Sequence, residues 1–424
     1  MSLPDIASKL ERVSSTVSIA GRSLLGLDTN PVSDDWSHIT KVDPEGEKQL
    51  PLCFPLYLSQ TSAISVGGSR DVTGPRTEEA FELLEYAPVP AFHEPSAAQH
   101  VTEKTRDHAE FLAIPEVLNG DSEALVGTLG QGIEYIQEDL GPSMIEEKLG
   151  FSLDGGVGKR LTAFGAGYML QDAVFEAYII MNPDSAAARE ASVTEDDLLT
   201  PQEAKQRALA AEYHLESEVI YLEYSGTYGG EEATDILETI SDSVTWSRLW
   251  YGGGLDNRNH AKEVLEAGAD AVIVGDIFHE IANEEADLVE QARGEFDSIP
   301  SRDELADWIE QTVAINETSA ARFLSTIVTV PDPQARALSY LAAGVEMALE
   351  LDALAETADE PTTDEVAHMV QDETLSIEAD FGDVLDGRDA TAAAEAISEA
   401  LLAERYELGE ETIVSARQVG LSLS

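Results

Sequence analysis

The sequence predicts an α/β fold, a (β/α)8 barrel of the TIM type followed by an all-helical C-terminal extension. Short apolar runs alternate with helix-like segments, as parallel strands buried on both faces do. A helical pattern at 263–265 ends at Gly268 just before the last run, as a β/α unit requires. Beyond about residue 296 the strand-like runs fade. The predicted strands span residues 39–42, 63–66, 89–92, 111–114, 177–181, 219–222, 249–251 and 271–274.

Three segments are expected along the chain. Residues 1–30 mix charged and apolar positions at helical spacing and are predicted as an N-terminal helical segment. The barrel is expected over 31–296. Between Asn119 and Tyr178 the chain is longer than one barrel unit needs, so we predict an inserted surface loop near 140–165.

Residues 297–424 are predicted as an acidic helical extension. From Arg302 onward, Leu305, Trp308, Ile309 and Val313 recur at helical spacing. A proline pair breaks the chain near 331–333, and further helices are expected over about 334–354 and 392–406. The sequence does not indicate a role for this extension.

Acidic residues dominate the composition, with 82 Asp and Glu against 25 Lys and Arg, for a formal charge of -57. Such self-repulsion suits a protein whose charges are screened by concentrated salt, so we expect a halophilic surface. An apolar content of 43% argues against a disordered acidic chain. Without clustered Lys and Arg, nucleic acid is not an expected partner, and small molecules are favoured.

The single cysteine, Cys53, excludes an internal disulfide and fits reducing cytoplasm. No run reaches the ~20 apolar residues that span a bilayer. We therefore expect a soluble cytoplasmic protein, for which peripheral contact with a membrane through a lipid substrate stays open.

Glycines follow the last two predicted strands, at Gly252-Gly253-Gly254 and Gly275. In barrels of this type, phosphate commonly binds at these two loops. Glycine lets backbone N–H groups approach an anion, and the next helix N-terminus adds partial positive charge. The sequence therefore predicts a phosphate site, with a pair of tight turns as the alternative.

Strand one ends in Lys41-Val42-Asp43, so strand alternation directs Lys41 and Asp43 to the same side. A cation and a hard oxygen ligand together suit a phosphate and a Mg²⁺ ion that bridges a diphosphate. The hydroxyl of Ser69, after Gly67-Gly68, completes such a magnesium site in this interpretation. An ordinary ion pair is the alternative.

Glu223 lies in the strand-six motif Tyr221–Gly226, where a carboxylate facing the barrel mouth accepts a proton from a substrate hydroxyl. The alternative for Glu223 is a structural hydrogen-bond acceptor. Each of these motifs alone is weak evidence for a functional site, whereas their joint occurrence at strand ends indicates one.

With these strand ends assembled, the chain resembles the geranylgeranylglyceryl phosphate synthase family, which includes bacterial heptaprenylglyceryl phosphate synthases, and specifically its haloarchaeal type. The resemblance runs from about Trp36 to Glu280. The motifs that carry it are those at 36–44, 67–69, 115–119, 182–184, 221–226, 251–254 and 274–276.

The resemblance implies magnesium-dependent transfer of a prenyl group from a polyprenyl diphosphate to sn-glycerol 1-phosphate, in archaeal membrane lipid synthesis. In a halophile the implied donor is geranylgeranyl diphosphate. Glu223 is implied to orient or deprotonate the glycerol hydroxyl, and Asp43 and Ser69 match the magnesium positions. The positions that match the glycerol phosphate site are Lys41, Tyr221, Leu222, Glu223, Tyr224, Ser225, Gly226, Gly254, Gly275 and Asp276. Residues near Phe92, Ile114, Leu118 and Tyr178 are expected to line a prenyl groove.

Two departures from the family stand out. Asp276 replaces the usual Asn, and its carboxylate repels a bound phosphate unless it faces away, meets a cation or leaves the binding to backbone N–H groups. The extension and the insertion are not required by a compact barrel. A catalytically weakened barrel that serves as a binding or scaffold protein, another phosphate-binding barrel enzyme, and a homo-oligomer therefore stay open.

Overall fold

The computed structural model describes residues 28–68, 71–140, 142, 173–408, 416–421 and 423. Nearly all of the predicted N-terminal helical segment, most of the predicted insertion near 140–165, and Ser69 lie outside these residues.

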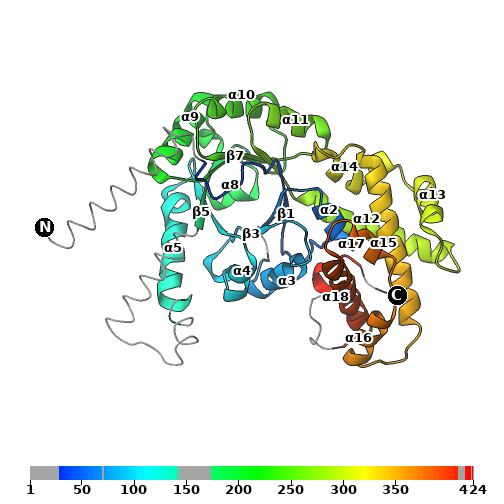
Figure 1. Ribbon diagram of the computed structural model, residues 1–424. Helices are drawn as coiled ribbons and strands as arrows, with labels where there is room; N and C mark the ends of the chain where they lie inside the picture. Colours follow the sequence, from blue (N-terminus) through cyan, green and yellow to red (C-terminus); the bar gives the residue numbers. More distant parts are fainter. Residues whose placement is uncertain are drawn as a thin grey trace.

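Strands β1 to β8 form a closed barrel in which every neighbouring pair is parallel, from β1 with β2 round to β8 with β1 (Figure 1). The predicted (β/α)8 fold is confirmed, and each strand overlaps its predicted run. The strands are β1 (His38–Val42), β2 (Ala63–Val66), β3 (Ala91–His93), β4 (Leu112–Val117), β5 (Ala173–Ile180), β6 (Val219–Tyr224), β7 (Arg248–Gly253) and β8 (Ala271–Val274).

Side chains alternate between the barrel interior and the helix layer, because successive residues of a strand point to opposite faces. In the interior, Trp36 stacks on Phe92, Phe111 and Trp250 with ring centroids 6.0, 6.1 and 6.4 Å apart. Phe111 precedes β4 and Trp36 precedes β1, so this aromatic layer fills the N-terminal end of the barrel. The polar interior positions are consequently at the opposite, C-terminal end.

Helices follow the strands in the barrel segment and cover its outside (Figure 1). Local sequence explains several boundaries: Thr200 caps the helix that begins at Pro201, and the Glu203 carboxylate accepts the Thr200 N–H at 2.9 Å in return. The helices are α2 (Phe54–Leu58), α3 (Gly74–Leu84), α4 (Glu103–His108), α5 (Thr128–Tyr135), α8 (Ala186–Glu190), α9 (Pro201–Ala210), α10 (Gly230–Ser241), α11 (Arg258–Glu266) and α12 (Asp276–Glu295).

The extension is helical, as predicted, and contains more helices than the sequence indicated. The helices expected from Arg302, over 334–354 and over 392–406 correspond to α13, α15 and α18; α14, α16 and α17 were not predicted. The extension comprises α13 (Arg302–Thr312), α14 (Ser319–Thr326), α15 (Pro333–Ala355), α16 (Thr363–Asp372), α17 (Ile377–Gly382) and α18 (Gly387–Arg405).

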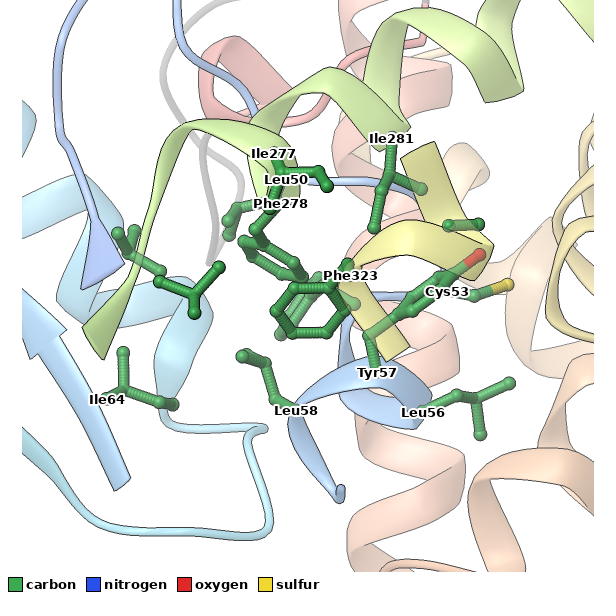
Figure 2. Close-up of a cluster of buried hydrophobic side chains, with 14 of the residues drawn as sticks. Leu50, Cys53, Leu56, Tyr57, Leu58, Ile64, Ile277, Phe278, Ile281 and Phe323 are labelled. Carbon is green, nitrogen blue, oxygen red and sulfur yellow. The ribbon is translucent and has the colours of Figure 1, made fainter. Parts of the chain in front are cut away.

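Helix α14 packs directly on the barrel, beside α2 and α12. The ring of Phe323 packs against those of Phe278 and Tyr57 (Figure 2), with centroids 5.0 and 6.3 Å apart. It also lies 5.8 Å from the ring of His38. On β1, His38 Nε2 lies 3.0 Å from the hydroxyl of Thr326, and burial lowers the pKa of His38 to about 3. Because α2 has only five residues, α14 covers barrel surface that a longer helix after β1 would cover. The barrel and the extension therefore share one hydrophobic core.

No helix among the described residues is both long enough and apolar enough to cross a membrane.

Candidate active site

Polar side chains from four strands meet at the C-terminal mouth of the barrel, and Glu94 is at their centre. The ammonium of Lys41 on β1 donates to both Glu94 carboxylate oxygens, at 3.2 and 3.1 Å. The hydroxyl of Ser65 on β2 donates to Glu94 at 2.9 Å, and that of Tyr178 on β5 at 2.5 Å. Glu94, which directly follows β3, was not predicted from the sequence. Its one signal is alternation, which places it on the same face as the interior Phe92.

The charges in this cluster are set by burial and by each other. Burial raises the pKa of Glu94, but the charge of Lys41 and the hydrogen bonds from Tyr178 and Ser65 outweigh it and lower the pKa below its usual value. Burial has the opposite effect on Lys41 and lowers its pKa, but the charges of Glu94 and Asp43 outweigh burial and raise the pKa above its usual range. Lys41 and Glu94 therefore form an ion pair.

A second interior carboxyl lies on β5 near this pair. Burial and then the charge of Glu94 raise the pKa of Glu176 well above its usual value. The negative charge of Glu94 thus disfavours ionisation of Glu176, as is usual for two adjacent buried carboxyl groups. Oε2 of Glu176 is buried and has no hydrogen-bond partner among the described residues. Glu176 was not predicted from the sequence either. As a charged residue directly before the apolar run 177–181, it resembles a break in the strand.

The motif Tyr221–Gly226 is divided by strand alternation between two faces. Tyr221 belongs to the interior cluster, where its ring lies 4.4 Å from that of Tyr178. Leu222 and Tyr224 instead pack in the core between strands and helices, so their side chains face away from the mouth. Gly226 has φ +83, a left-handed conformation that favours glycine. Ser225 is exposed, between the strand and this turn.

Tyr221 also depends on a glycine of the next strand. A Cβ atom on Gly252 would lie 1.9 Å from the Tyr221 hydroxyl oxygen, so only glycine lets this ring lie across β7. The first glycine of the predicted phosphate loop therefore shapes the wall of the mouth.

Glu223 has the environment of a proton acceptor. Its Oε1 accepts the backbone N–H of Ser225 at 3.0 Å, whereas Oε2 is buried without a partner in the described part of the chain. Burial raises the pKa of Glu223, and the hydrogen bonds from Ser225 and the charge of Lys41 offset this only in part. A carboxylate oxygen that lacks a donor and has a raised pKa is suited to accept a proton from a bound hydroxyl.

The predicted phosphate loops lie at the mouth, but their N–H groups are not equally available. The Gly254 N–H already donates to the carbonyl of Thr227 at 2.7 Å. Gly275 lies against Lys41: a Cβ atom there would be 3.3 Å from the Lys41 Cβ. Helix α12 begins at the next residue, so the positive end of its dipole lies beside Gly275, although the first-turn N–H of Phe278 already donates to the Gly275 carbonyl at 2.9 Å. Gly275, Lys41 and this helix N-terminus thus form the more suitable anion site.

Asp276 meets a cation, which was one of the conditions expected for its tolerance. Lys48, in the loop after β1, donates to Asp276 Oδ1 at 2.8 Å and to Asp43 Oδ2 at 2.5 Å. Burial raises the pKa of Asp276, but Lys48 outweighs it, so the pKa of Asp276 is lowered. Asp276 is exposed and its charge is compensated within the protein.

The backbone of Asp43 is fixed by a histidine of α12. The Asp43 N–H donates to His279 Nε2 at 3.0 Å, and His279 Nδ1 lies 2.9 Å from the carbonyl oxygen of Gln49. This pairing needs a neutral ring that donates from Nδ1 and accepts at Nε2. Burial, the largest influence, lowers the pKa of His279, in agreement with that state.

The predicted magnesium site is only partly within the described structure, because Ser69 lies outside it. Among the described residues, no group of three or more His, Cys, Asp or Glu side chains has metal-site geometry. Carboxylate oxygens of Asp43 and Glu45 nevertheless lie 2.5 and 3.6 Å from the Lys48 ammonium. Hard oxygen donors around a cationic position fit the chemistry of magnesium.

The residues expected to line a prenyl groove do not share one face of the sheet: Phe92 and Tyr178 belong to the interior cluster, whereas Leu118 packs in the core between strands and helices. Phe92 is fully buried in the aromatic layer at the N-terminal end of the barrel. Tyr178 is at the mouth, where its hydroxyl contacts Glu94. Ile114 alternates with the interior residue Ala113, so it faces the outer layer.

Comparison with known proteins agrees with the sequence motifs. The chain matches the PcrB family over residues 33–293. It is 30% identical over 251 residues to the geranylgeranylglyceryl phosphate synthase of Haloquadratum walsbyi, covering 58% of this chain and 88% of that protein. The synthase of Halobacterium salinarum is 29% identical over 248 residues, covering 58% and 89%.

A crystal structure of (S)-3-O-geranylgeranylglyceryl phosphate synthase from Thermoplasma acidophilum, in complex with sn-glycerol-1-phosphate, is 21% identical. It covers 57% of this chain and 86% of its own, with a TM-score of 0.42. The family match spans the whole barrel, which is more than half of the chain. The chain therefore belongs to the PcrB family.

Proposed function

We propose that this protein joins geranylgeranyl diphosphate to sn-glycerol 1-phosphate through an ether bond; its relatives from Haloquadratum walsbyi and Halobacterium salinarum are named geranylgeranylglyceryl phosphate synthase. The observation that carries the proposal is Glu223, a buried carboxylate with one unpartnered oxygen at the barrel mouth. Lys41, a cation suited to a phosphate, is at the same mouth and is near enough to affect the pKa of Glu223.

In this proposal the glycerol phosphate lies between strands β6 and β8. Lys41, Gly275 and the first turn of α12 bind its phosphate, and Tyr221 forms the wall beside it. Glu223 Oε2 accepts the proton of the attacking hydroxyl as its oxygen bonds to the first prenyl carbon. The bond from that carbon to the diphosphate breaks and takes its electron pair with the leaving group. A positioned general base of this kind contributes roughly 10²–10⁴-fold to the rate.

Magnesium is proposed as the cofactor, held by Asp43 and by Ser69, which follows Gly67-Gly68 in the sequence. When bound, the ion neutralises charge on the leaving diphosphate. The electrostatics of the mouth support a need for added cations. Lys41 is paired with Glu94, and Lys48 is shared by Asp43 and Asp276, so part of their positive charge is already balanced within the protein and does not by itself neutralise two anionic substrates. The buried, single cysteine is consistent with the proposed cytoplasmic location.

The direct test uses purified protein in concentrated KCl with Mg²⁺, labelled sn-glycerol 1-phosphate and geranylgeranyl diphosphate. We expect an ether-linked product, and we expect Glu223→Gln to lose turnover while the fold is retained. Glu116→Gln is the matched control, because Glu116 is a buried carboxyl whose pKa burial raises to about 7, on the opposite face of β4 from the interior residues. Absence of product with any prenyl length refutes the proposal. Wild-type turnover in Glu223→Gln removes this residue from the mechanism.

One observation favours a second candidate, a catalytically weakened barrel that acts as a binding or scaffold protein. The Lys41 ammonium is engaged by both oxygens of Glu94, which competes with a phosphate for the same cation. Calorimetry with sn-glycerol 1-phosphate separates the two functions. If the protein is the proposed enzyme, wild type binds sn-glycerol 1-phosphate. The substitution Asp276→Asn then changes the affinity little, because Lys48 already compensates the charge of Asp276. Binding by Asp276→Asn alone favours the scaffold.

A further inference from the structure

The loop after β1 is paired with a segment more than 350 residues later in the chain. The Leu50 N–H donates to the carbonyl of Gln418 at 2.7 Å, and the Gly420 N–H donates to the carbonyl of Leu50 at 2.9 Å. Leu50 and Val419 thereby form an isolated parallel β-bridge. Residues 416–421, here named the C-terminal segment, lie outside the part of the chain matched by the family.

The C-terminal segment is packed into the protein as an ordered part of its core. Ala416, Val419 and Leu421 are buried in the core shared by the barrel and the extension. Gly420 lies against α12 so closely that a Cβ atom there would be 2.5 Å from the Cβ of Ala282. The segment also contacts α3, the helix after β2, and α18.

The other supports of the same loop come from α12. His279 binds the backbone of Asp43 and of Gln49, and the Glu285 carboxylate accepts the N–H of Leu52. Leu50 lies between these two supports, and both of its backbone polar groups are bound by the C-terminal segment. Without the segment, the loop keeps its contacts with α12 at Asp43, Gln49 and Leu52. The backbone N–H and carbonyl of Leu50 then lose their partners.

We infer that the C-terminal segment positions the loop that presents Asp43 and Lys48 at the barrel mouth, so the extension supports the active site and not only the barrel wall. This inference rests on the proposed function, in which Asp43 holds magnesium. The segment acts through the loop and touches no reacting atom. Misplacement of a catalytic group by about 1 Å can cost roughly 10²-fold in rate, so a small shift of this loop is measurable.

The substitution Gly420→Ala tests the inference, because the new methyl group meets Ala282, a side chain that cannot rotate away. Gly382→Ala in the extension is the matched control, since a Cβ atom there has nothing within 4 Å. The double variant Gly420→Ala with Ala282→Gly removes the clash and is the rescue. Each full-length protein is compared by hydrogen exchange of peptides that cover residues 43–52, and by steady-state kinetics with varied Mg²⁺ and prenyl diphosphate.

We expect faster exchange of residues 43–52 in Gly420→Ala, a rise of roughly tenfold in the Mg²⁺ concentration for half-maximal rate and a lower kcat, on the scale of a small misplacement. The rescue restores these quantities toward wild type, and the control leaves them unchanged. Wild-type exchange and wild-type kinetics in Gly420→Ala overturn the inference, as does faster exchange with unaltered kinetics. If wild type itself makes no product, the proposed function has failed and with it the catalytic role of the segment. In that event, exchange still tests whether the segment holds the loop.

Discussion

Replacing Phe323 with alanine should destabilise the barrel, although Phe323 lies in the extension. The side chain is fully buried and contacts aromatic rings of α2 and α12 (Figure 2). It also contacts the His38 ring of β1. Truncation of a buried Phe to Ala typically costs about 3–5 kcal/mol. Each lost aromatic pair accounts for about 0.5–1.5 kcal/mol beyond the area term. We expect the upper part of the range, because the contacts fix α14 against a barrel helix of only five residues.

Tryptophan fluorescence can be used to follow unfolding of the barrel and of the extension separately. Trp36 and Trp250 are in the aromatic layer of the barrel, whereas Trp308 is on α13 of the extension. Equilibrium unfolding by denaturant at a fixed KCl concentration is followed by fluorescence, in the natural sequence and with Trp308→Phe as background. A single core predicts one transition for both reporters, and Phe323→Ala moves it to lower denaturant concentration in both backgrounds.

The control is Ile299→Ala, at an exposed side chain just before α13, which should change the free energy of unfolding by no more than about 0.5 kcal/mol. The reasoning is refuted if Phe323→Ala shifts only the Trp308 signal and leaves the barrel transition in place. That result would mean that the two parts unfold as independent units.

Three further predictions concern single sites. Burial raises the pKa of Glu285 to about 8, so its contribution to stability is greatest at acid pH and is lost as pH rises from about 4.5 to 8. Over this range, the free energy of unfolding of Glu285→Gln should increase relative to that of wild type by up to about 1.4 kcal/mol per pH unit. Denaturant titrations at several pH values measure this difference. Gly252→Ala should cost about 1–3 kcal/mol in thermal unfolding and lower turnover, because the methyl group displaces Tyr221; an unchanged melting temperature would contradict this. Lys48→Met should weaken sn-glycerol 1-phosphate binding in calorimetry about tenfold by leaving Asp276 uncompensated, and a second substitution, Asp276→Asn, should restore it.

The strands were predictable because the barrel imposes a simple pattern on its sequence. Parallel strands that are covered on both faces need continuous apolar residues, and runs such as 271–274 have this pattern. Helix α14 was not predictable in the same way. It has only eight residues, so its apolar positions do not recur over enough turns to distinguish a helix from a short strand or a loop.

Site residues that lie in motifs at strand ends were predictable from the sequence, whereas the ion pairs that form across the barrel were not. Alternation alone directs Lys41 and Glu223 inward, but it does not reveal that Lys41 reaches Glu94, which follows β3, a strand that does not neighbour β1. The contact of Lys48 with Asp276 joins residues 228 positions apart. Such ion pairs depend on loop conformation, which periodicity does not encode.

The bond between His38 and Thr326 has a consequence for synthesis of the chain on the ribosome. The last strand of the barrel is complete about 50 residues before Thr326 is made, a delay of several seconds at ~5–20 residues per second. During that interval the nascent barrel lacks the helix that covers His38 and Tyr57, and it exposes apolar surface. Folding of the barrel is therefore expected to finish only after α14 has been made, with the earliest strand waiting for one of the later helices.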